Sequence, residues 1–258
     1  MKHKGPEKTA HDKGQTMNTV SSNTVSFTAH STSQTLQAAI QQDLDFAIED
    51  LMASLPDPKY LSADHKRGII ARYTAVLEGN FIYWMTGAYL AVASEEARLT
   101  ILDNLHEEVH DSHPRMLRKF ALAAHAIPTD TDAISIHRDL TNVRLFVGRL
   151  AGVRIVIMMA FFEGFIQRFM SYLAELAEGR GSVEFEYTDV HGVCDVAHTQ
   201  GLFGALAAEM ELDPPEPTTE LLEGVDLLRT LIQSVIDPAE VNRGQPLGLA
   251  LRAHTRSL

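Results

Sequence analysis

The chain has 258 residues, of which 45% are hydrophobic, and this is enough to bury a substantial core within one large domain. A formal net charge of -12 and the lack of a Lys/Arg cluster exclude nucleic acid and anionic membrane surfaces as expected partners. The single cysteine cannot form an intrachain disulfide, and no apolar stretch reaches the roughly 20 residues that span a bilayer. We therefore expect a cytoplasmic protein that binds a small-molecule substrate, with no nucleic-acid or membrane partner.

The first half of the chain contains a polar leader followed by amphipathic helices. Residues 1–34 are rich in Lys, Thr, Ser and Asn and lack an apolar period, so we predict a disordered leader. Apolar residues at helical spacing predict one helix over 35–55 and a second over 62–91. A serine followed by two glutamates opens a third helix, over 94–113.

The second half continues the helical pattern. Pro114 either bends the preceding helix or begins a new one. Later helices are expected over 130–178, with a break near Gly148 or Gly152, then through His191 to about 210, and over 218–236, before a loose tail at 238–258. Strand-like alternation is almost absent. Seven or eight helices should therefore form an all-α, single-domain bundle over residues 35–237.

The strongest motif is formed by His191, Asp195 and His198, which lie four and three residues apart. On a helix these steps advance the chain by about 400° and 300°, so the three side chains share one face within roughly two turns. Imidazole and carboxylate together suit iron, manganese or zinc. The alternative is a solvated polar stripe, and the choice depends on whether other helices supply matching carboxylates.

Two further segments offer such groups. Glu163 lies among apolar residues, where a carboxylate is costly unless it is paired, ligates a cation or is protonated. Glu107 and His110 have the Glu-x-x-His spacing that the helical di-iron bundles show, and Glu108 and His113 lie beside them. On one continuous helix Glu107 and His110 share a face and Glu108 does not point with His113. A distortion before the proline would change this register, and two of these four residues could be surface groups.

At this point the sequence resembles the haem-oxygenase-like di-metal oxidases and oxygenases, over roughly Ser62 to Met210. The resemblance rests on Asn104-Leu105, Glu107-Glu108, His113-Pro114-Arg115-Met116-Leu117, Glu163 and His191-x-x-x-Asp195-x-x-His198. It implies a haem-oxygenase-like helical bundle that holds two non-haem irons per chain and activates O2. The family fold is often dimeric, so a homodimer is expected.

The same resemblance implies the roles of the metal ligands. Glu163 would bridge or cap the irons, and the His191 motif would ligate them. The leading glutamate of the family matches Glu108 or Glu107, and the following histidine matches His113 or His110. The implied activity is a biosynthetic oxidoreductase acting on a small amino-acid-, amine- or fatty-acid-like molecule.

Two other functions fit the sequence. A thiaminase-like, metal-independent enzyme on the same scaffold would use Cys194 as a nucleophile beside His191 or His198. A non-enzymatic helical partner protein would use its polar residues only to fix packing. Iron binding would distinguish the iron-dependent oxidoreductase from both of these alternatives.

Overall fold

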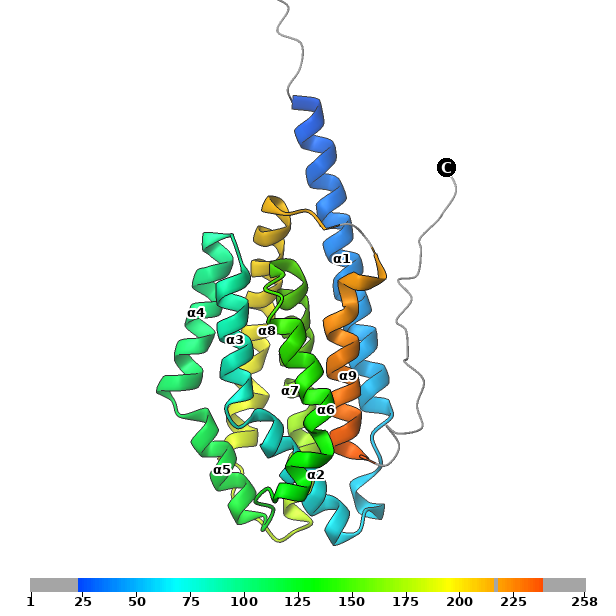
Figure 1. Ribbon diagram of the computed structural model, residues 1–258, viewed down its shortest axis with the longest axis vertical. Coiled ribbons are helices and arrows are strands. Elements are labelled where there is room, and N and C mark those ends of the chain that lie inside the picture. The colour runs from blue at the N-terminus through cyan, green and yellow to red at the C-terminus, as the bar shows by residue number, and fades with distance from the viewer. Residues whose placement is uncertain (1–22, 216–217, 239–258) are drawn as a thin grey trace, which may run out of the picture.

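The computed structural model describes residues 23–215 and 218–238, which are almost entirely helical and contain no strand (Figure 1). The elements are α1 (Asn23–Ala53), η1 (Pro58–Tyr60), α2 (Ala63–Leu77), α3 (Asn80–Ala91), α4 (Glu95–His110), α5 (His113–Ala123), α6 (Asp130–Val147), α7 (Gly152–Glu178), α8 (Glu186–Leu212), η2 (Thr219–Leu222) and α9 (Glu223–Ile236). The prediction of an all-α bundle is confirmed.

Helix α7 lies in the middle of the bundle, with α3 and α4 on one side of it and α1 and α9 on the other (Figure 1). It packs most extensively against α8 and also contacts α2. Its side chains from Ile155 to Ile166 are all buried, as expected for a helix that is apolar nearly all round. Any charged group on α7 in this stretch must therefore find its partner inside the protein.

Two breaks that position the functional residues depend on left-handed backbone. The single helix expected over 62–91 is instead two helices, α2 and α3, because Gly79 adopts φ 87° between them. The helix that ends at His110 is separated from α5 by Ser112, which has φ 59° and ψ 40°. Pro114 follows in the first turn of α5, where its missing N–H leaves no backbone partner unsatisfied. The break near Gly148 and Gly152 was predicted, and α6 and α7 meet there.

The amino-terminal boundary differs from the prediction. The expected leader at 1–34 overlaps α1, which already begins at Asn23 and projects beyond the other helices in Figure 1. The polar composition of this segment gives no apolar period, so the pattern could not reveal its helix. The rest of the expected leader, and the expected tail from residue 239 on, lie outside the described residues.

Helix α4 is fixed at its start by two polar contacts. Ser94 caps it by accepting a hydrogen bond from the Ala97 N–H at 3.3 Å, as its position in the sequence predicts. The buried carboxylate of Glu209, on α8, accepts the Ala93 N–H at 2.9 Å and the Ser94 N–H at 2.8 Å. These bonds hold the start of α4 against α8, so both helices can present side chains to a common site.

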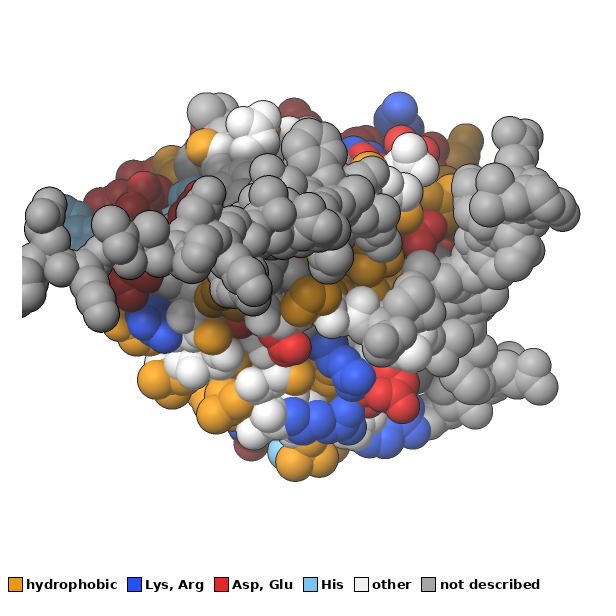
Figure 2. Space-filling view, turned by 90° about the horizontal axis from the view of Figure 1, so that it is seen from above, with side chains coloured by type: hydrophobic (Ala, Val, Ile, Leu, Met, Phe, Trp, Pro, Cys, Tyr) orange, Lys and Arg blue, Asp and Glu red, His pale blue; other side chains and the backbone are white. Residues whose placement is uncertain are grey.

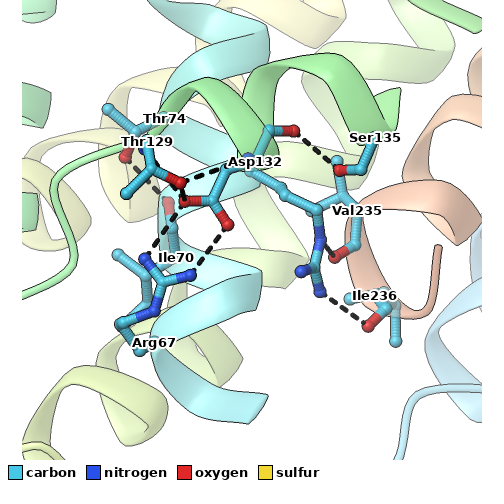
Figure 3. Close-up of polar contacts among 9 residues, drawn as sticks. Arg67, Ile70, Thr74, Thr129, Asp132, Ser135, Val235 and Ile236 are labelled. Atoms are coloured by element: carbon cyan, nitrogen blue, oxygen red, sulfur yellow. Dashed lines mark hydrogen bonds and ion pairs between the residues drawn. The ribbon is translucent and has the colours of Figure 1, made fainter. Parts of the chain in front are cut away.

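A second polar network joins α2, α6 and α9 (Figure 3). Arg67 donates two hydrogen bonds to Asp132, at 2.8 and 3.1 Å, while Asp132 and Thr129 form a capping box at the start of α6. Arg72 donates to the carbonyl oxygens of Val235 and Ile236 at the end of α9. The network satisfies helix ends that would otherwise leave backbone groups unpaired.

Figure 2 looks onto one end of the bundle, where hydrophobic, basic and acidic side chains lie interspersed. Among the described helices, none combines the length and the apolar character needed to cross a bilayer.

Candidate metal centre

Two buried groups of metal-binding side chains meet between α4, α5, α7 and α8. The first triad is Glu108, His113 and His191, and the second triad is Glu163, Asp195 and His198. Within each triad, one ligand atom from every residue lies within 4.8 Å of the others. All six side chains are buried. Four helices therefore converge on two neighbouring places where a cation could be held.

One hydrogen bond joins two residues of the first triad, and the third lies close to them. His113 Nδ1 lies 2.8 Å from Glu108 Oε1, and His191 Nε2 lies 3.7 Å from the same oxygen. His191 Nδ1 lies 2.8 Å from the carbonyl oxygen of Tyr187. Because a carbonyl can only accept, Nδ1 carries the proton, and in the neutral ring Nε2 is left with a lone pair directed at Glu108. This is the tautomer that a metal ligand needs.

The break between α4 and α5 creates this triad. Five residues along a continuous helix advance the chain by about 500°, which would turn His113 away from Glu108. The left-handed Ser112 and the new start at His113 bring the imidazole back to the carboxylate. The two histidine rings of the first triad then meet edge to face, with their centroids 4.5 Å apart.

The charges in the first triad follow from burial and mutual pairing. Burial opposes ionisation of Glu108, but the hydrogen bond from His113 and the neighbouring imidazoles outweigh it and lower the pKa of Glu108 to about 2. Burial likewise lowers the pKa of His113, and its bond to Glu108 overcomes this and raises the pKa. Glu108 is therefore an anion at neutral pH, as a cation ligand must be.

The side chains of the second triad lie farther apart than Glu108 and His113 do in the first. His198 Nδ1 lies 3.9 Å from Glu163 Oε2 and 3.7 Å from Asp195 Oδ1, too far for hydrogen bonds. Glu163 Oε1 and His198 Nδ1 are buried and have no hydrogen-bond partner among the described residues. Ligand atoms that each lie about 2.1 Å from one cation are at most about 4.2 Å apart. A bound metal ion would therefore satisfy atoms that the protein itself leaves unsatisfied.

The acid–base properties of the second triad also favour a bound cation. Burial raises the pKa of Glu163, whose side chain is only 3% exposed. Burial lowers the pKa of His198, but the carboxylates of Glu163, Glu107 and Asp195 together raise it to about 9. Without a cation, the triad needs protons to offset its negative charge, and a divalent cation would replace them.

Two of the predicted ligands lie outside both triads. Glu107 is about half exposed, and its Oε2 lies 2.9 Å from His198 Nε2, on the side of the ring that faces away from Glu163 and Asp195. His110 is exposed and pairs with Asp111 at 2.9 Å. The structure thus pairs Glu108 with His113, and the helical Glu-x-x-His face of Glu107 and His110 does not enter the triads.

Two buried tyrosines lie beside the first triad, and no sequence pattern indicated them. The ring of Tyr187 lies 4.2 Å from that of His191, and its hydroxyl bonds to that of Tyr73 at 2.9 Å. Tyr187 acts on His191 through its backbone carbonyl, which every residue has. The only sequence signal for this contact is position: in a helix, the carbonyl of residue 187 lies beside the side chain of the histidine four residues later.

The sequence model of a family described as iron-containing redox enzyme matches residues 70–231, more than half of the chain. The chain belongs to this family. The matched range includes both triads. No curated protein and no solved structure is similar enough to the sequence to count as a match.

The ligand set of this iron-containing redox enzyme suits the metal of its family. Each triad mixes imidazole nitrogen with carboxylate oxygen, and such mixed sets bind iron in non-haem sites. The description of the family supports neither the thiaminase-like, metal-independent enzyme that would use Cys194 nor a non-enzymatic partner protein. Cys194 lies in α8, but its side chain is outside the described residues.

A pocket reaches both triads of the enzyme. Its empty volume is about 390 Å³, part of which opens to solvent. Glu108, His113, His191, Glu163 and Asp195 line its polar side, and Tyr187 lies with them. The other walls are apolar: Leu77, Phe81, Ile82, Pro114, Leu117 and Ile166. Residues of both triads therefore line one space, whose opposite walls are apolar.

Proposed function

We propose that this iron-containing redox enzyme is a non-haem di-iron oxidase or oxygenase that holds one iron in each triad and acts on a small organic substrate. The observation that carries the proposal is the pair of adjacent buried triads, each composed of histidine and carboxylate groups from more than one helix. A lone solvated polar stripe would not place all six side chains out of water. Ferrous iron bound there would supply the electrons and the coordination positions with which O2 is activated.

The protein's own residues prepare the centre for such a cation. The Tyr187 carbonyl holds His191 in the tautomer whose Nε2 faces the first triad. Glu107 accepts a hydrogen bond from His198 Nε2, so that Nδ1 faces Glu163 and Asp195. Glu163 brings its negative charge from within an apolar helix, where little water competes for a cation.

The apolar walls of the pocket support a substrate with an uncharged portion next to the metals. Phe81, Leu117 and Ile166 offer no hydrogen bonds and exclude water from the polar side. Water exclusion strengthens the electrostatic interactions within the site and protects a reactive oxidant from solvent. Of the amino-acid-, amine- and fatty-acid-like substrates expected from the family resemblance, those with an apolar chain match these walls best.

Iron stoichiometry tests the proposal. Protein loaded anaerobically with ferrous iron should retain about two irons per chain after desalting. His191→Ala should lose the iron of the first triad, His198→Ala that of the second, and the double variant should lose both. His137→Ala, at an exposed position on α6, is the matched control and should retain both. Retention of all iron in the double variant, or no iron in the wild type, would overturn the proposal.

A reaction with O2 completes the test. The loaded wild type should consume O2 faster than the double variant and show a transient visible absorption band on mixing. If two irons bind and neither signal appears, the protein is an iron-binding member of the fold without oxygenase activity.

A further inference from the structure

The pocket that reaches both triads is enclosed on most sides. Of its twelve lining residues ten are buried, and the two that are partly exposed are Ile82 and Pro114. Ile82 lies in the first turn of α3, and Pro114 lies in the first turn of α5. In the described part of the chain, the pocket therefore opens to solvent between the starts of these two helices.

An exposed ion pair joins the same two sides of the pocket. Arg118, on α5, donates a hydrogen bond to Glu78 at the end of α2, with 2.6 Å between Nη1 and Oε1. Each of them directly follows a leucine that lines the pocket, Leu117 and Leu77. Arg118 also lies four residues after Pro114, on the same face of α5. The ion pair therefore lies beside the opening, outside the apolar wall.

The helices on both sides of the opening are anchored by other contacts. Asn80, in the first turn of α3, accepts a hydrogen bond from Arg144 of α6 at 2.7 Å. His113, the first residue of α5, is bonded to the buried carboxylate of Glu108 on α4. The backbone around the opening is therefore fixed, and side chains are the part that can move.

The ion pair is the more movable of these side-chain groups. Glu78 is 39% exposed and Arg118 is 64% exposed, so both side chains can rotate into water without displacing a helix. Exposed ion pairs contribute little free energy, because water solvates the separated charges well. The pair can therefore break and re-form readily, whereas Ile82 stays in place on an anchored helix.

We propose that molecules reach the triads between Ile82 and Pro114, and that the Glu78–Arg118 pair and the side chain of Ile82 determine the size of molecule that passes. The formed pair narrows the opening, and a bulkier apolar molecule passes Ile82 when the pair separates. The entrance depends only on the geometry of the pocket. Its use by a substrate rests on the proposed function.

Reaction of an introduced cysteine with uncharged thiol reagents tests the entrance without any metal ion. Ile166, on the buried wall of the pocket, is replaced by cysteine in the full chain carrying Cys194→Ser. The rates of modification by methyl and benzyl methanethiosulfonate are then measured. Leu173→Cys, seven residues later on the same face of α7 and outside the pocket lining, reports general opening of the bundle. Ile166→Cys should react faster, and Leu117→Cys is a second reporter if that variant does not fold.

Loss of the ion pair should speed the reaction inside the pocket. In the Ile166→Cys protein, Glu78→Gln or Arg118→Gln should raise the rate with the benzyl reagent about threefold, as expected when an exposed ion pair is removed. High salt should speed the protein that keeps the pair and leave Glu78→Gln unchanged, because salt screens exposed charges. Glu223→Gln is the matched control, since it removes an exposed pair with Arg149 whose residues do not line the pocket. It should not change the rate.

Shortening Ile82 should widen the fixed part of the opening. Ile82→Ala should speed the benzyl reagent more than the methyl reagent. Unchanged rates in the Glu78, Arg118 and Ile82 variants, or equal acceleration of Leu173→Cys, would overturn the proposal. Because the cysteine reaction needs no iron, a protein that binds none loses the di-iron function while this experiment still decides where the pocket opens.

Discussion

The two triads contain similar groups but differ in how fully the side chains within each triad form hydrogen bonds with one another. In the first triad, Glu108 and His113 are 2.8 Å apart and form a hydrogen bond. In the second triad, His198 Nδ1 stands 3.7 and 3.9 Å from its neighbouring carboxylates, and Glu163 Oε1 has no hydrogen-bond partner in the described part of the chain. The first triad therefore has one internal hydrogen bond without a metal ion, whereas the carboxylates and the imidazole of the second triad are spaced for a cation between them. Removing a carboxylate should have opposite effects on the stability of the apoprotein at the two places.

The largest expected effect on stability is at the first triad. Glu108→Ala leaves His113 buried without its partner, so the free energy of unfolding of the apoprotein should fall by about 3 kcal/mol. Urea unfolding in the presence of a chelator measures it. Glu107→Ala, at the adjacent half-exposed position, is the control and should change stability by less than about 1 kcal/mol. Equal losses in the two variants would contradict the comparison.

Metal binding should stabilise the protein through both triads. Ferrous iron at about 100 times its dissociation constant should raise the free energy of unfolding by about 2.7 kcal/mol for each site. In Glu163→Met the contribution of the second site should disappear while that of the first remains. Anaerobic thermal unfolding with and without iron measures both. An unchanged melting temperature in wild type would show that neither triad binds iron.

The apoprotein should respond to Glu163→Met in the direction opposite to Glu108→Ala. Methionine fills a similar volume and removes a buried carboxylate whose Oε1 is unsatisfied, so the chelated protein should gain about 1 kcal/mol. Chemical unfolding with chelator present provides the measurement. A loss of stability in this variant would mean that Glu163 is already well paired without a metal.

The smallest expected effect lies outside both triads and provides a pH control. Burial opposes ionisation of Asp132, but hydrogen bonds from Arg67 and Thr129 outweigh it and hold its pKa below the usual range. Its contribution is therefore complete above about pH 4, the pKa of an unfolded aspartate, and is lost as pH falls through the lowered folded value. Asp132→Asn should cost about 1 kcal/mol at neutral pH and progressively less in acid, as measured by unfolding at several pH values. A cost that did not depend on pH would assign the effect to packing.

Much of the fold could be predicted because helical periodicity and capping are local properties. Ser94 and its two following glutamates marked the start of α4, and the apolar run of α7 indicated the central helix. The errors occurred where local patterns carry no signal. The hydrophobic period of α2 and α3 continues across the break at Gly79, and the polar start of α1 has no period at all.

In the candidate site too, spacing along one helix could be predicted and contacts between helices could not. His191, Asp195 and His198 lie on one helix, so their spacing alone placed them on a common face. Glu163 was indicated by its apolar neighbours. The choice between His110 and His113 depended on the backbone of Ser112, which no spacing rule predicts, and the choice between Glu107 and Glu108 depended on how α4 packs.

The sequence by itself determined an all-α chain with candidate metal ligands on three predicted helical segments, because spacing along a helix fixes which side chains share a face. Only the tertiary structure decided which of those side chains meet. One left-handed residue before α5 turned His113 onto Glu108, and the packing of α4 on α8 left Glu107 at the surface against the outer nitrogen of His198. Contacts between helices depend on breaks and packing angles, and these arise from the whole fold.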